Sequence, residues 1–447
     1  MPKRKSGVLL HLAHVSRQNE TTPFEYTFLD LLSNNGQQIW QHLPINPPGK
    51  ENSPYSALSA FAGDPKILSE NLIVKYRESD YKKWIEENSD WCFDWAIFNY
   101  FKQLFGNKEW YKWPKEYKFY NENNINVMIK KEERFITEIL LKQFVFDRKW
   151  AVLKKKCNDK NISLFGDIPF YVALDSSDVW SKPHLFDLDE NLAPKSIAGV
   201  PPDYFSAKGQ IWENPLYDWK QHSKDNYLWW QRRIDINKRR FDILRIDHFR
   251  AMVSSWSIKP KSKTAADGYW RRGPGNKLLD KIIEILPKKY LVAEDLGLIT
   301  KSVKKLIKDY KIKGMNVLQF GYDSKFPNEH HHTKVKRNSV CYLGTHDNNT
   351  IKGWFEEMQK GNKKECYDSL VRDYHLDGTN ICKEMIKIAM NTKADLCIIT
   401  IQDLLELGEE GRINIPGNKK RNWNLIIKQE DIRNIDWIYL KKLTEQN

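Results

Sequence analysis

Short apolar stretches recur along this chain of 447 residues, and segments with the apolar spacing of a helix lie between many of them. The stretches are at 7–12, 38–44, 162–170, 241–249, 289–295, 316–320, 340–346 and 395–402. Segments 279–286 and 303–310 show the intervening pattern, with apolar residues at helical spacing. Apolar strands that alternate with charged helices form a parallel sheet covered by helices, and eight such strands close a barrel. The sequence therefore predicts an α/β fold, a (β/α)8 TIM barrel.

Two long excursions interrupt this alternation, one after the second predicted strand and one after the third. The first, 46–160, contains helical patterns, including one with Ile136, Ile139 and Phe144 on a single face. The second, 171–223, is rich in Pro, Asp and aromatic residues and shows little periodicity. Segments that follow barrel strands rise over the face where active sites lie, so both excursions are expected to be parts of the barrel domain. We therefore expect one catalytic barrel unit over 1–447. Within it, 46–160 is predicted to be a largely helical insertion subdomain and 171–223 a loop-rich insertion over the active site.

Composition narrows the possible functions. Apolar residues make up 40% and charged residues 29% of the chain, and no apolar run approaches the roughly 18 residues of a membrane span. The net charge of +14 comes from basic residues spread along the whole chain, so we expect a solvated surface and no nucleic-acid or membrane partner. The cysteines occur singly, and no signal peptide is predicted. A reducing cytoplasm is therefore the expected location.

Carboxylates follow several of the predicted strands. Asp167, Asp247, Glu294 and Asp347 each come directly after an apolar stretch, where barrel enzymes place their chemistry. Helix capping is the alternative for any single one of them, because Asp and Asn favour that position. Paired carboxylates at the mouth of a barrel are, however, the arrangement that cleaves glycosidic bonds.

The neighbours of two of these residues suggest roles. Arg245 and Asp247 lie on the same face of a predicted strand, so the guanidinium is expected to keep Asp247 ionised, as a nucleophile requires. Glu294 follows an apolar run, and partial burial is expected to raise its pKa toward the range of a general acid.

Three of the strand ends carry a family resemblance. Segments 245–250 (RIDHFR), 291–297 (LVAEDLG) and 344–348 (GTHDN) resemble the catalytic blocks of the amylomaltases, the 4-α-glucanotransferases of glycoside hydrolase family 77 in the α-amylase clan. Further matching blocks, in order, are 7–11, 53–56, 59–63, 166–169, 175–180, 199–206, 209–210, 214–217, 402–405 and 422–423. The resemblance thus extends from about residue 7 to about residue 425.

The resemblance implies a retaining double displacement on α-1,4-glucan, with maltooligosaccharides and linear glucans as substrates and no cofactor or metal. Asp247 matches the nucleophile, Glu294 the general acid/base and Asp347 the third carboxylate. The substrate-binding positions that it implies are Tyr55, Asp175, Tyr204, Phe205, Gln210, Trp212, Arg245, His346 and Asn414. Segment 201–210 matches a loop over the active site, which would exclude water from the covalent intermediate.

The chain departs from the family pattern at a few places. Segment 14–22 differs from the usual Pro/Gly-rich stretch, Glu213 stands where the family typically has Gly, and Ala251 also replaces a usual Gly. Two alternatives therefore stay open: a mainly hydrolytic α-glucosidase or amylase on the same barrel, and a glucan-binding protein that has lost turnover. The run 330–332 (HHH) could be a metal tract, but without an acidic cluster beside it we favour a solvated loop.

Overall fold

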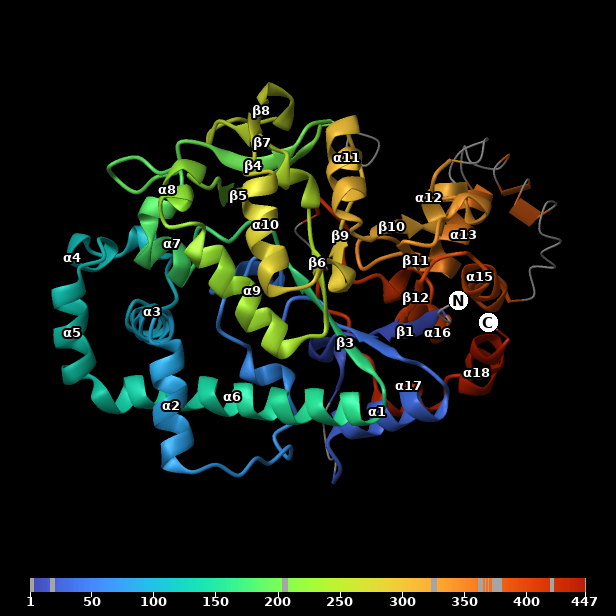
Figure 1. Cartoon of the computed structure of the whole chain (residues 1–447), viewed down its shortest axis with the longest axis horizontal. Coiled ribbons are helices and arrows are strands. Elements are labelled where there is room, and N and C mark those ends of the chain that lie inside the picture. Colours follow the sequence, from blue (N-terminus) through green and yellow to red (C-terminus); the bar gives the residue numbers. More distant parts are fainter. Residues whose placement is uncertain are drawn as a thin grey trace.

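The computed structural model describes residues 4–16, 21–202, 208–322, 328–360, 365, 367–368, 370–371, 380–418 and 422–446. Eight parallel strands form one sheet in the order β10-β11-β12-β1-β2-β3-β6-β9 (Figure 1). Their bounds are β1 (Lys5–Leu9), β2 (Ile39–Gln41), β3 (Ser163–Ile168), β6 (Ile243–Ile246), β9 (Leu291–Ala293), β10 (Gly314–Val317), β11 (Ser339–Tyr342) and β12 (Leu396–Thr400). A parallel bridge between Val292 and Lys313 joins the two edges, so the sheet closes into a barrel. Each predicted stretch overlaps one of these strands, and the predicted (β/α)8 class is confirmed.

Side chains that alternate along the strands divide between two cores. Leu9, Phe165 and Tyr342 belong to the core inside the barrel. Val8 and Leu164, their neighbours in sequence, pack outward against the surrounding helices. These helices include α1 (Phe24–Asn34), α9 (Leu228–Arg240), α10 (Asn276–Ile285), α11 (Lys301–Tyr310), α13 (Ile351–Lys360), α15 (Ile381–Met390) and α18 (Trp437–Glu445).

The chain between β2 and β3 is irregular over most of 42–77 and largely helical from residue 78 onward. The helices are α2 (Glu78–Asn88), α3 (Cys92–Leu104), α4 (Lys115–Lys118), α5 (Glu122–Lys131) and α6 (Glu133–Asp159). The long helix α6 runs along one side of the molecule and buries Ile136, Ile139 and Phe144, the face expected from their spacing (Figure 1).

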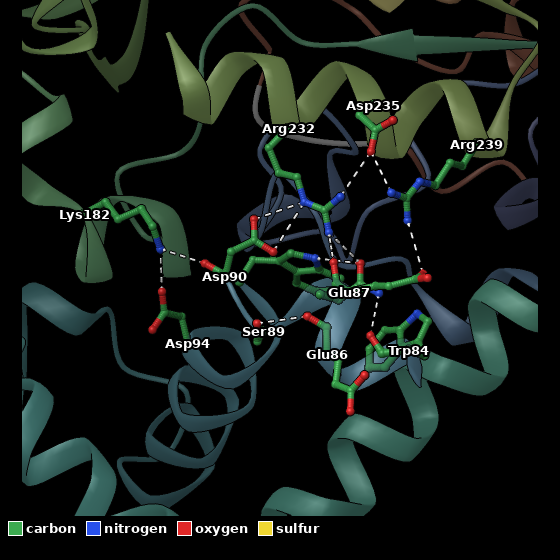
Figure 2. A network of polar contacts seen from close by, with 12 residues as sticks. Trp84, Glu86, Glu87, Ser89, Asp90, Asp94, Lys182, Arg232, Asp235 and Arg239 are labelled. Atoms are coloured by element: carbon green, nitrogen blue, oxygen red, sulfur yellow. Dashed lines mark hydrogen bonds and ion pairs between the residues drawn. The ribbon is translucent and has the colours of Figure 1, made fainter. Parts of the chain in front are cut away.

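Ion pairs fasten the turn between α2 and α3 to the barrel (Figure 2). Arg232 of α9 pairs with Asp90 at 3.1 Å. Lys182, at the end of α7 (Ser177–Ser181), pairs with Asp94 of α3 at 2.6 Å. The helical segment is therefore held both by α9 and by the segment that follows β3.

A second, antiparallel sheet lies at one end of the barrel, in the order β5-β4-β7-β8 (Figure 1). Its strands are β4 (Ile197–Val200), β5 (Gln210–Pro215), β7 (Ser254–Ile258) and β8 (Tyr269–Arg272). This sheet was not predicted from the sequence. Two of the strands come from the connection between β3 and β6, and two from the connection between β6 and β9. Among the described residues, no helix is both long and apolar enough to cross a membrane.

Candidate active site

The segments that follow β6 and β9 are bound to each other at the carboxyl end of the barrel. The backbone N–H of Glu294 donates to the carbonyl of Ile246 at 3.0 Å, and the N–H of Phe249 donates to the carbonyl of Glu294 at 3.1 Å. His248 has a left-handed backbone with φ of 51°, a conformation that non-glycine residues adopt rarely and often at functional sites. These contacts place Asp247 and Glu294 on neighbouring strand ends.

Arg245 connects two carboxylates at this end of the barrel. Its side chain is nearly buried, at 5% exposure, and its Nη2 lies 2.8 Å from Oδ1 of Asp247. Its Nη1 lies 2.5 Å from Oδ2 of Asp167. The hydroxyl of Tyr55 donates to the same Asp167 oxygen at 2.6 Å. Asp167 is therefore the shared partner of two residues that the family resemblance places in the substrate site.

Burial governs the protonation of the two central acids. It raises the pKa of Glu294 to about 8, and the negative charge of Asp247 adds to this rise. Burial also raises the pKa of Asp247 to about 6, although Arg245 opposes the change. The expected rise at Glu294 is therefore present. At Asp247 the guanidinium lowers the pKa in the expected direction, but desolvation outweighs it, so the net shift is upward.

Asp347 is the most open of the three acids, with 43% of its side chain exposed. Its Oδ1 accepts a hydrogen bond from Nδ2 of Asn414 at 2.6 Å and lies 3.4 Å from Nε2 of His346. The His346 ring stacks on Tyr55, with 5.0 Å between ring centres. The charge of Asp347 also raises the pKa of Asp247, so the two carboxylates act on the same region of the site.

Gln210 and Trp212 of β5 lie beside the segment that follows Asp247. Nε1 of Trp212 donates to Oε1 of Gln210 at 3.0 Å. The Trp212 ring packs edge-on against His248, with 4.7 Å between ring centres. This geometry brings the small sheet to the mouth of the barrel.

Three residues that the resemblance assigns to substrate binding remain: Asp175, Tyr204 and Phe205. Asp175 is engaged by the helical insertion, since its carboxylate lies 2.7 Å from Nζ of Lys102 and accepts the N–H of Trp110 at 3.1 Å. Tyr204 and Phe205 lie outside the described residues.

Two residues at this site were not among the predicted site residues. Asp167 was one of the four carboxylates noted in the sequence pattern but was not assigned to the site; it lies within β3, one residue before the strand ends. Its link to Tyr55 spans 112 positions in the chain and has no sequence signal. Trp423 lies 5.8 Å from the Tyr55 ring and 5.7 Å from the His346 ring. Its place in a family-like Asn-Trp pair was the one available signal.

The three consecutive histidines engage neighbouring groups. Nδ1 of His330 accepts the backbone N–H of Val317 at 3.3 Å, and Nδ1 of His332 lies 2.9 Å from the Tyr322 hydroxyl. Within the part of the chain that the structure describes, no three His, Cys, Asp or Glu side chains are grouped to hold a metal ion.

A raised-pKa acid beside an ionisable partner, at the carboxyl end of a (β/α)8 barrel, is typical of enzymes that act on glycosidic bonds. Comparison with known proteins specifies the family. The model of glycoside hydrolase family 77, described as 4-alpha-glucanotransferase, matches residues 22–76 and 69–430, and the chain belongs to this family.

Relatives cover nearly the whole chain. A 4-alpha-glucanotransferase of Aquifex aeolicus is 36% identical over an alignment that covers 98% of each protein. One from Streptococcus pneumoniae is 32% identical and covers 97% of this chain and 95% of its own. Among solved structures, an amylomaltase from Streptococcus agalactiae in complex with acarbose superposes with a TM-score of 0.91 at 30% identity, covering 99% of both chains. The resemblance recognised in the sequence is confirmed.

Proposed function

We propose that this chain transfers α-1,4-glucan segments between maltooligosaccharides or linear glucans, through a covalent glucosyl-enzyme. The observation that carries the proposal is the pair of partly buried acids on neighbouring strand ends, Asp247 and Glu294, whose pKa values desolvation raises to about 6 and about 8. At neutral pH one is mainly ionised and the other mainly protonated, as a nucleophile and a general acid must be. Membership of the 4-alpha-glucanotransferase family supports the reaction type.

In the first step, the Asp247 carboxylate attacks the anomeric carbon as Glu294 gives its proton to the departing glycosidic oxygen. The glycosidic bond breaks, and an ester bond forms between the glucosyl unit and Asp247. In the second step, the Glu294 carboxylate takes the proton from the 4-hydroxyl of an acceptor sugar, whose oxygen displaces Asp247. Both residues return to their starting states.

The other polar residues of the site help to stabilise the positive charge that develops at the anomeric carbon in the transition state. The Asp347 carboxylate, partly exposed and held by Asn414, is available to bind hydroxyls of the same sugar. The Arg245 guanidinium forms ion pairs with both Asp167 and Asp247. Anionic groups that face a developing positive charge stabilise the transition state more than the ground state.

Chromatography of the products from pure maltotriose tests this proposal. A transferase yields glucose together with oligomers longer than maltotriose, whereas a hydrolytic α-glucosidase or amylase yields only shorter sugars. Asp247→Asn should remove both kinds of product, because the amide cannot form the ester. A folded Asp247→Asn protein that still lengthens maltotriose would contradict the assignment of the nucleophile.

A glucan-binding protein without turnover gives a different result. If the chain were such a protein, wild type would bind maltotriose in calorimetry but form no product during a long incubation with it. The complete set of paired acids at the described site favours turnover over this alternative.

We also propose a cytoplasmic location. Cys92, Cys157, Cys341, Cys382 and Cys397 all carry free thiols. Cys341 and Cys397 are register partners on adjacent strands and are not joined, a state maintained in reducing compartments. Fractionation of the source cells, followed by thiol titration of the purified protein, tests this location.

A further inference from the structure

Lys102 provides a buried positive charge at the end of α3. Its side chain is only 8% exposed. Nζ donates to the backbone carbonyls of Asn107 and Lys108, at 3.0 Å each, and to Oδ2 of Asp175 at 2.7 Å. All three hydrogens of the ammonium group therefore have an acceptor, and one of these is a carboxylate outside the helical insertion.

Asp175 is held from both sides. While Oδ2 contacts Lys102, Oδ1 accepts the N–H of Trp110 at 3.1 Å. The indole N–H of Trp110 in turn donates to the carbonyl of Leu174, the residue before Asp175. With 22% of its side chain exposed, Asp175 still reaches solvent. Its carboxylate thus has a fixed orientation and an open edge.

The segment that leads to Asp175 contacts the small sheet at the mouth of the barrel. Nδ2 of Asn214 in β5 donates to the carbonyl of Val172, three residues before Asp175, at 2.8 Å. The ring of Tyr171 lies 6.2 Å from the ring of Trp212. The Trp212 ring in turn packs against His248, beside the proposed nucleophile. Asp175 therefore lies on the side of the site bounded by Trp212.

We propose that Lys102 is a positioning residue for glucan binding, which fixes the Asp175 carboxylate so that it can accept hydroxyl groups of the bound sugar chain. This inference rests on the proposed function. A carboxylate held in place before binding accepts hydroxyl hydrogen bonds without paying ordering entropy. Lys102 comes from the insertion between β2 and β3, so that insertion contributes to the affinity for glucan.

The site is built for a lysine. Three acceptors converge on one nitrogen, which suits a tetrahedral ammonium and not the planar guanidinium of arginine. Lys102→Arg would keep the charge but could not direct hydrogens to all three acceptors. Lys102→Met would remove the charge and keep most of the apolar stem.

The chain offers a matched control. Lys182 pairs with Asp94 of α3 at 2.6 Å, so it also joins the insertion to the segment after β3, but its contacts do not include Asp175 (Figure 2). Trp180 packs against Phe98 and Trp113 in the same region, at 5.9 Å between ring centres in each case. This aromatic core should keep the insertion folded when either ion pair is removed.

The experiment compares Lys102→Met, Lys182→Met, Asp175→Asn and the Lys102→Met/Asp175→Asn double variant. KM and kcat for maltotriose disproportionation, the dissociation constant for maltotriose by calorimetry and the melting temperature are measured for each. We expect Lys102→Met and Asp175→Asn each to raise KM by about fivefold or more, with kcat within about threefold of wild type. The double variant should match Asp175→Asn, because the two residues act as a unit.

Two results would overturn the inference: a folded Lys102→Met protein with the KM of Lys182→Met, or additive effects in the double variant. If Lys102→Met does not fold, Lys102→Arg takes its place, and a KM equal to that of wild type then overturns the inference. If wild-type protein does not lengthen maltotriose, the proposed function fails, and the calorimetric dissociation constants still decide the role of Lys102.

Discussion

The side-chain amide of Asn414 donates a hydrogen bond of 2.6 Å to the carboxylate of Asp347, which lies 67 positions earlier in the chain. The guanidinium of Arg412 supports the same junction by donating to the backbone carbonyl of Asp347 at 3.2 Å. The loop near the end of the chain is thereby tied to the strand end that carries the third acid. Changes in this loop should therefore act directly on the chemistry at Asp347.

Asn414→Asp should impair the enzyme far more than Asn414→Ala. The new carboxylate would face Asp347 at hydrogen-bond distance, and two like charges there cannot both stay ionised without a large cost. We expect kcat/KM to fall by about 100-fold or more for the Asp variant and by about tenfold for the Ala variant. Because a shared proton would relieve the repulsion, the activity of the Asp variant relative to wild type should rise as the pH is lowered. Equal losses in the two variants would contradict this view of the pair.

The pH dependence of kcat/KM should be bell-shaped. Activity needs Asp247 ionised, so it should fall as the pH drops below about 6, the pKa to which burial raises this residue. It also needs Glu294 protonated, so it should fall as the pH rises above about 8. The two limbs belong to the interacting pair. In Glu294→Gln the alkaline limb should disappear together with most of the activity, whereas an unchanged alkaline limb would assign it to another group.

Glu213→Gly should stabilise the protein slightly. Glu213 has a φ of 65°, in the left-handed region where a side chain costs about 1 kcal/mol and glycine does not. This explains physically why glycine suits the position. A rise of about 1–2 °C in melting temperature is expected, measured by differential scanning fluorimetry. Glu213→Ala, which keeps the Cβ atom and removes the carboxylate, should stay near wild type. A stabilised Ala variant would attribute the effect to charge instead.

His42→Phe should make the protein more resistant to acid. His42 is fully buried between Trp40 and Trp150, and neither ring nitrogen has a hydrogen-bond partner among the described residues. Burial lowers its pKa from 6.5 to about 3. The unfolded chain therefore takes up this proton first, and the contribution of the neutral ring to stability, complete above pH 6.5, is lost as the pH falls toward 3.

The test of this effect is the change in melting temperature between pH 7 and pH 5. At pH 5 the linkage amounts to about 2 kcal/mol, since each unit below 6.5 contributes about 1.4 kcal/mol. The decrease on acidification should be smaller in His42→Phe than in wild type. The same decrease in both proteins would show that His42 does not titrate on unfolding.

The barrel could be predicted from sequence because each strand has a local signal. In the run 289–295, for example, the apolar residues 291–293 are followed directly by Glu294 and Asp295. The small antiparallel sheet has no comparable signal. Its strand β5 is mostly half-buried and contains a left-handed residue at Glu213. Its pairing partner β4 ends ten positions earlier, and β7 follows only after β6. Such strands form because they pair with strands from other segments, so their own residues do not predict them.

The candidate site shows the same division. Asp247, Glu294 and Asp347 could be located because they follow strands within recognisable blocks. Their protonation could not be fully predicted, because it depends on desolvation by residues from distant segments. Asp167 and Lys102 have no local signal for their roles, since each acts through a partner more than 70 positions away.

The four strands of the small sheet come from the two connections on either side of β6, the strand that leads to Asp247. Hydrogen bonds between β4 and β7 join the two connections. A change in β4 or in β7 therefore acts on both connections, so the two should be inherited as a matched set. In engineering terms, a chimaera that exchanges glucan preference with a relative would have to transplant both connections together.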